Sequence, residues 1–136
     1  MKIAKPISLM VIILLITSIS GCLGYVPTLK VTTIISGTTD APIIESIETE
    51  QGTIDALRGP KDHPPSMPGV YVLVIKERMG TINYWTSVPY AGPGTYELTA
   101  GFKTAPNPGD NLLVLVQVVD EQGDTIARNE TVMIWR

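Results

Sequence analysis

The sequence predicts an all-β protein with one antiparallel β-sandwich of about seven strands, and a small β-barrel is the alternative. Apolar and mostly polar residues alternate from Tyr96 to Lys103, as on a strand with one buried face. Residues 70–75 and 112–116 are continuous apolar runs, rich in β-branched side chains and too short for buried helices. No apolar period of 3.6 residues persists beyond two turns, so helix is not expected to dominate.

Residues 1–21 have the features of an export signal. Lys2 and Lys5 precede an apolar run from Ile7 to Ile19. As a helix this run spans about 20 Å, which is short of the ~30 Å hydrocarbon core that a stable transmembrane helix crosses. The sequence therefore predicts a signal peptide, and an uncleaved membrane anchor is the alternative.

The apolar run is followed by Ile19-Ser20-Gly21-Cys22, which resembles the lipobox of secreted lipoproteins. The resemblance implies that a diacylglycerol is attached to the sulfur of Cys22 and that the chain is cut between Gly21 and Cys22. The protein would then be exported and anchored to the outer face of the cell membrane by lipid. We expect residues 22–28 to form a short tether and residues 29–136 to form the domain.

Strands follow one another along the predicted domain. Glycine-containing turns at 77–80 and 120–124 predict two hairpins. Thr53 is expected to cap a single helical turn over residues 53–58. The expected strands cover residues 29–35, 43–49, 70–75, 82–88, 96–102, 112–119 and 125–134.

Residues 94–100, Gly-Thr-Tyr-Glu-Leu-Thr-Ala, resemble the immunoglobulin-domain strand that carries a tyrosine corner. Leu98 stands where antibody domains have the second bridging cysteine. The resemblance implies an immunoglobulin-like sandwich without a disulfide.

Charge and cysteine content exclude several kinds of function. The net charge is −3; without residues 1–21, eight of the ten basic and all 13 acidic side chains remain, which gives −5. A nucleic-acid ligand is not expected, because it requires clustered Lys and Arg. Cys22 is the only cysteine, so an internal disulfide and a thiolate metal cluster are excluded.

No residue pattern predicts a catalytic, cofactor or metal site. His63, the only histidine, has Asp62 beside it but too few further ligands for a transition metal. Asp120, Gln122 and Asp124 mimic the start of a calcium loop, but Thr131 stands where the bidentate Glu belongs, so a plain turn is favoured. We therefore expect a protein that is not an enzyme and that holds no cofactor.

Candidate binding residues lie in the proline-rich connection before the third expected strand, in a glycosylation sequon and at four aromatic positions. The connection contributes Pro60, His63, Pro64, Pro65, Met67 and Pro68, which we expect to contact a partner. Asn129-Glu130-Thr131 is a glycosylation sequon with Asn129 as its acceptor. Four aromatic residues could form a surface for stacking sugars: Tyr84, Trp85, Tyr90 and Trp135.

Three functions are compatible with these features. The preferred hypothesis is a non-enzymatic module that binds or scaffolds another protein of the cell envelope. A carbohydrate-binding surface module is the second. A lipid-anchored hydrolase or its accessory subunit is the third, and it would depend on carboxylates such as Glu48 and Glu50 on one strand face.

Overall fold

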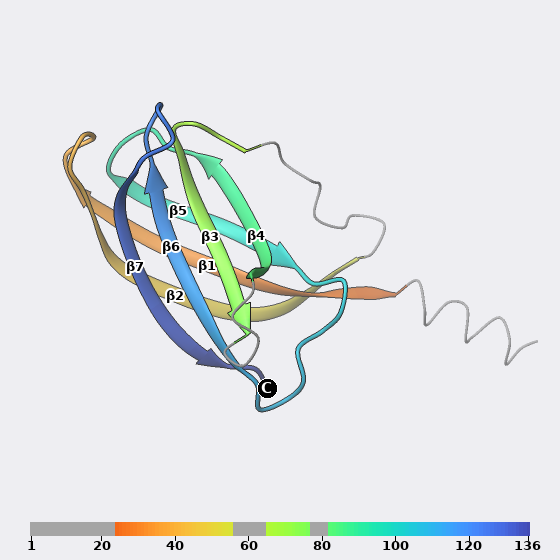
Figure 1. Cartoon of the computed structure of the whole chain (residues 1–136). Helices are drawn as coiled ribbons and strands as arrows, with labels where there is room; N and C mark the ends of the chain where they lie inside the picture. Colours follow the sequence, from red (N-terminus) through yellow and green to blue (C-terminus); the bar gives the residue numbers. More distant parts are fainter. Residues whose placement is uncertain (1–23, 56–64, 77–81) are drawn as a thin grey trace, which may run out of the picture.

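The computed structural model describes residues 24–55, 65–76 and 82–136 (Figure 1). The expected signal peptide, Cys22, Pro60, His63 and Pro64 lie outside these residues. The described part contains no helix. Its seven strands are β1 (Tyr25–Gly37), β2 (Pro42–Asp55), β3 (Gly69–Lys76), β4 (Ile82–Pro89), β5 (Gly94–Gly101), β6 (Asn111–Val119) and β7 (Thr125–Ile134).

The strands form two antiparallel sheets that face each other (Figure 1). One sheet has three strands in the order β2-β1-β5, and the other has four in the order β4-β3-β6-β7. Along one side β2 lies beside β7, and along the other β4 lies beside β5, but the sheets do not close into a barrel. The prediction of a β-sandwich is therefore confirmed.

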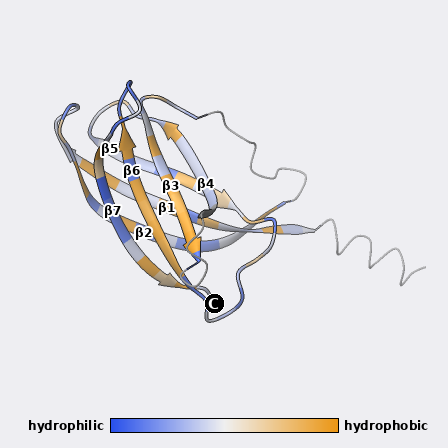
Figure 2. Ribbon diagram, viewed as in Figure 1, coloured by the Kyte–Doolittle hydropathy of each residue, from blue (hydrophilic) through white to orange (hydrophobic). Residues whose placement is uncertain are grey.

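The core fills the space between the sheets with alternate residues of each strand. Val70, Val72 and Val74 of β3 are fully buried, as is Val31 of β1. Figure 2 shows that β3 and β6 are apolar along most of their length. The inner residues of β6 are the partners of those of β3 in the antiparallel register, and they are Leu112, Val114, Val116 and Val118.

Two expected boundaries were wrong. β1 begins at Tyr25, so residues 25–28 belong to the sandwich and not to a tether. β2 continues to Asp55, so Thr53 caps no helical turn there; residues 56–58 lie outside the described part. In both places antiparallel pairing of β1 with β2, from Tyr25 opposite Asp55 onward, satisfies the backbone groups and overrides the local signals.

The tyrosine corner is present on the predicted strand, but that strand belongs to a different sheet from the one that carries it in immunoglobulin domains. The Tyr96 hydroxyl donates to the carbonyl of Gly92 and accepts the N–H of Ala91 at 3.0 Å, and Leu98 is buried two residues later. In immunoglobulin domains this motif lies on a strand of the sheet opposite the first two strands. Here it lies on β5, hydrogen-bonded to β1, and β1 rather than the second strand is central in its sheet.

Candidate functional site

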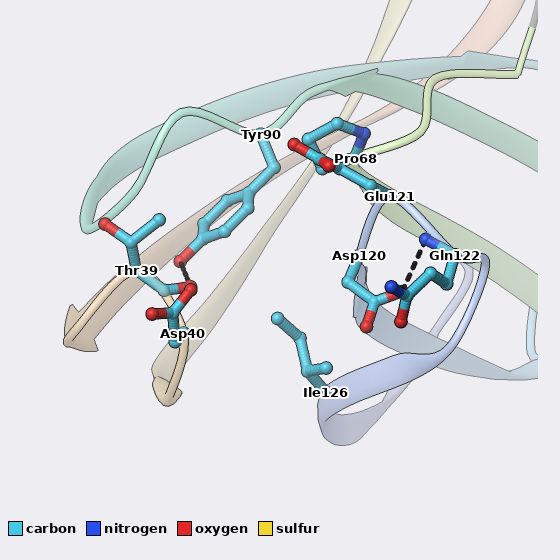
Figure 3. Close-up of a pocket in the computed structure, with 8 residues that line it drawn as sticks. All are labelled: Thr39, Asp40, Pro68, Tyr90, Asp120, Glu121, Gln122 and Ile126. Carbon is cyan, nitrogen blue, oxygen red and sulfur yellow. Dashed lines mark hydrogen bonds between the residues drawn. The ribbon is translucent and has the colours of Figure 1, made fainter.

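A pocket of about 270 Å³ opens at the end of the sandwich where β1 finishes (Figure 3). Four separate segments meet there: the β1–β2 turn, the stretch before β3, the loop after β4 and the β6–β7 connection. The residues that line it are Thr39, Asp40, Pro68, Tyr90, Asp120, Glu121, Gln122 and Ile126.

Tyr90 joins three of these segments. Its hydroxyl donates to the carbonyl of Thr39 at 3.0 Å, and its backbone N–H donates to the carbonyl of Pro68 at 3.2 Å. Burial raises the pKa of the Tyr90 hydroxyl, and Tyr96 and Asp40 add to the shift. The hydroxyl therefore stays protonated at neutral pH and serves as a hydrogen-bond donor.

The β6–β7 turn is held by Asp120. Its Oδ1 accepts the backbone N–H groups of Gln122 and Asp124, both at 2.9 Å. Gly123 adopts φ 85°, a conformation that favours glycine and completes the turn. The carboxylate that would open a calcium loop is thus directed at the turn's own backbone.

The rim of the pocket is acidic, and its walls are partly apolar. Asp40, Asp120 and Glu121 contribute carboxylates, and among the described residues no Lys or Arg lines the pocket. Pro68 and Ile126 provide apolar surface beside them (Figure 3). Within residues 24–55, 65–76 and 82–136, no three His, Cys, Asp or Glu side chains are grouped so that they could hold a metal ion.

The described part of the proline-rich connection reaches this end of the sandwich. Pro65 and Met67 are exposed, while Pro68 lines the pocket. The Met67 thioether lies against Gly123 of the β6–β7 turn: its Sδ and Cε are 3.8 Å from the position that a Cβ would occupy there. Part of the predicted binding loop is therefore beside the pocket.

Asn129, the candidate glycosylation residue, lies on exposed β7 and already has a structural contact. Its Nδ2 donates to the carbonyl of Ile44 on β2 at 3.0 Å, so it links the two sheets along one side. Its Oδ1 accepts the N–H of Glu130 at 2.8 Å. The nitrogen that would carry a sugar is thus also an inter-sheet donor, and glycosylation of Asn129 stays a prediction.

The four aromatic residues proposed as a sugar platform do not share a surface. Tyr90 and Trp135 are each only 7% exposed, and Tyr84 packs against Phe102 with ring centroids 5.8 Å apart. Trp85 alone is exposed, stacked on Tyr71 at 6.1 Å. The prediction of a sugar-binding surface made of four rings was wrong, because three of the rings pack against the core.

Sequence reasoning missed an apolar surface on the outside of the four-stranded sheet. We call it the outer apolar face. The outward side of β3, β4, β6 and β7 also carries the polar residues Ser87, Gln117, Arg128 and Glu130. The outer apolar face is formed by the apolar residues on that side: Tyr71, Leu73, Ile75, Trp85, Leu113, Leu115, Val132 and Ile134. The signal for it was the absence of polar alternation in residues 70–75 and 112–116, which predicted central strands but not an uncovered side.

No protein-family model matches this chain, and a search of curated proteins finds no match. Among the described residues, no helix has the length and apolar character needed to cross a membrane.

Proposed function

We propose that the mature chain is a lipoprotein held on the outer face of the cell membrane by lipid on Cys22, and that it binds another envelope protein without catalysing a reaction. The binding site is the end of the sandwich that holds the pocket. The proposal is supported by the direction in which β1 runs and by the residues gathered at that end.

The direction in which β1 runs is the main support for the proposal. Only Leu23 and Gly24 separate Cys22 from the start of β1, so the leash from Cys22 to Tyr25 spans at most about 10 Å. β1 then extends for 13 residues, or about 40 Å at ~3.3 Å per residue, and finishes at the pocket. A lipid on Cys22 would thus lie at one end of the sandwich and the pocket at the other.

The pocket end has the character of a protein-binding surface. Connections held at the end of a rigid sandwich lose little conformational entropy on binding. Exposed Asp40 and Glu121 lie beside apolar Pro68 and Ile126, and the part of the lining that the structure describes contains no basic side chain. This combination suits a partner surface that presents basic side chains with long aliphatic stems.

Charge reversal at the pocket tests the binding site. Asp40→Lys combined with Glu121→Lys should abolish cross-linking of the full chain to its envelope partner in intact cells. The matched control is Glu48→Lys with Glu50→Lys, which reverses two exposed carboxylates on β2 away from the pocket. If both double variants retain the same partners, or both lose them, the pocket end is not the site.

The anchor is tested separately by mass spectrometry of the protein extracted from membranes. We expect a chain that begins at Cys22 and carries lipid, and no lipid in a Cys22→Ser variant. A wild-type chain that retains residues 1–21 without modification would contradict the anchor and leave the pocket test intact.

A further inference from the structure

The start of β1 and the end of β2 form a two-stranded ribbon that projects from the sandwich. Residues 25–27 of β1 pair with residues 53–55 of β2, whereas the pairing of β1 with β5 begins only at Thr28. Figure 1 shows this first part of β1 extending past the strands of the other sheet. We call residues 25–27 and 53–55 the ribbon tip.

Tyr25 is the outermost residue of β1 in the ribbon tip. It is 75% exposed, the highest fraction among the large apolar side chains that the structure describes. The next cross-strand pair, Val26 and Ile54, is partly exposed. Tyrosine combines an apolar ring with a polar hydroxyl, and it is enriched where a membrane meets water, with the ring at the level of the headgroups. The exposed ring therefore has the chemistry of a membrane-interface residue.

A lipid on Cys22 would hold this ring close to the bilayer. Only Leu23 and Gly24 separate Cys22 from Tyr25, so the Cα atoms of Cys22 and Tyr25 are at most about 10 Å apart. The polar layer outside the ~30 Å hydrocarbon core is about 5–8 Å thick on each side. Because these two lengths are similar, a chain anchored at Cys22 would keep Tyr25 at the level of the headgroups.

The charges at the opposite end of the sandwich favour contact through the ribbon tip. Asp40, Asp120 and Glu121 surround the pocket where β1 finishes, and the described lining contains no Lys or Arg. Anionic lipid repels such a group of carboxylates. A sandwich that lies flat brings these carboxylates closer to the bilayer than a sandwich that stands on its ribbon tip.

We propose that the ribbon tip is a membrane-contact site, in which Tyr25 lies among the lipid headgroups and holds the sandwich upright with the pocket facing away from the bilayer. The inference rests on the proposed lipid on Cys22. Because β1 extends for about 40 Å, a partner meets the pocket up to that distance above the headgroups. The alternative contact is the outer apolar face, which would lay the sandwich on its side.

Tryptophan substitutions at the two ends of the three-stranded sheet test the orientation. Tyr25→Trp places an indole at the ribbon tip. Ile43→Trp is the matched control, because Ile43 is 58% exposed and pairs with Ser36, about 36 Å along β1 from Tyr25. Each full chain is extracted from membranes with its lipid. It is then reconstituted into vesicles of phosphatidylcholine and phosphatidylglycerol that contain phosphatidylcholine with a spin-labelled headgroup.

The spin label quenches tryptophan emission only at short range, and the wild-type chain gives the background from Trp85 and Trp135. We expect the label to remove most of the emission that Tyr25→Trp adds to this background. The emission that Ile43→Trp adds should not change.

Removal of the ring tests whether Tyr25 itself holds the orientation. Tyr25→Ser added to Ile43→Trp should increase quenching of the tryptophan in place of Ile43, because the tethered sandwich can then tilt toward the bilayer. Thr53→Ser is the matched control, since Thr53 is also exposed in the ribbon tip, and it should leave the quenching unchanged.

Three results would overturn the proposal. Equal quenching of Tyr25→Trp and Ile43→Trp would show that the sandwich lies flat. Quenching of the wild-type chain that Trp85→Phe removes would assign the outer apolar face to the bilayer. Quenching of Ile43→Trp that Tyr25→Ser does not increase would show that the ring does not set the orientation.

The intact mass of the same samples separates failure of this inference from failure of the anchor. Lipid on Cys22 without quenching of Tyr25→Trp would refute the ribbon-tip contact and leave the anchor standing. A chain without lipid would refute both.

Discussion

The two outward sides of the sandwich differ in composition although both belong to antiparallel sheets. On the three-stranded sheet the outward rows combine threonines, glutamates and a lysine, and Lys30 Nζ lies 3.4 Å from Glu97 Oε1. On the four-stranded sheet one row holds Trp85, Leu73 and Leu115 and ends with Glu130 on β7, and the next row holds Ile75, Leu113 and Val132. The core needs only one apolar side per sheet, so the second apolar side of β3 and β6 calls for another explanation.

The largest expected effect comes from placing a charge on the inner side of the three-stranded sheet. Leu98→Asp should unfold the domain, because Leu98 is 2% exposed and a buried carboxylate there costs several kcal/mol without a partner. Thr99→Asp, one residue later on the exposed outer side, should change the free energy of unfolding by less than about 0.5 kcal/mol. Circular dichroism on heating measures both. If the Leu98→Asp domain melts like the wild type, the assignment of Leu98 to the inner side of the sheet and of Thr99 to the outer side is wrong.

Truncation on the two outer sides should give unequal losses. Leu115→Ala should reduce the free energy of unfolding by about 2–3 kcal/mol, because Leu115 is only 5% exposed although it points away from the core. Thr32→Ala, on the outer side of β1, should stay within about 0.5 kcal/mol. Urea denaturation at one fixed protein concentration compares them. Equal losses would mean that the outer apolar face contributes nothing to stability.

Hydroxyl removal compares one tyrosine from each sheet. Tyr96→Phe should lower the free energy of unfolding by about 1–2 kcal/mol, since the hydroxyl both donates to Gly92 and accepts from Ala91. Tyr71→Phe loses one bond, to the carbonyl of Ser66 at 2.9 Å, and should lose about 0.5–1 kcal/mol. The order of the two denaturation midpoints is the observable, and the reverse order would show that the tyrosine corner is not the stronger contact.

The smallest effect is expected at the exposed ion pair of the three-stranded sheet. Lys30→Met should change the free energy of unfolding by at most about 0.5 kcal/mol, because both side chains are largely solvated. The difference from wild type should shrink as salt is added. Parallel melts at low and high ionic strength test this, and a large loss that persists in salt would show that the polar side carries more stability than we assign to it.

The sequence predicted those features that depend on local pattern. Alternation placed Tyr84 and Val88 inward and Trp85 outward on β4, and the structure confirms all three. The hairpin turn at 120–124 was also predicted, because Gly123 supplies the backbone conformation that the turn requires. Such features follow from neighbouring residues alone.

Features that depend on distant partners could not be predicted. β5 lies beside β1 although about 60 residues separate them, and nothing local in Val31 indicates that Leu98 is its partner. The pocket likewise combines Thr39, Pro68, Tyr90 and Glu121 from four segments. A continuous apolar run such as residues 112–116 predicts that both sides of the strand are buried. It does not reveal whether other residues of the same chain cover the side that faces away from the core.

Ile134 and Ile43 allow the most direct test of the account, because they are equally exposed in the single chain, at 59% and 58%, on different sheets. Hydroxyl-radical footprinting of the full chain over a range of concentrations measures the solvent access of each. We predict that Ile134, Trp85 and Ile43 are all labelled rapidly, while Leu98, which is 2% exposed, is protected. Labelling of Leu98 that is as fast as that of Ile134 would contradict the assignment of Leu98 to the core and of Ile134 to the outer apolar face.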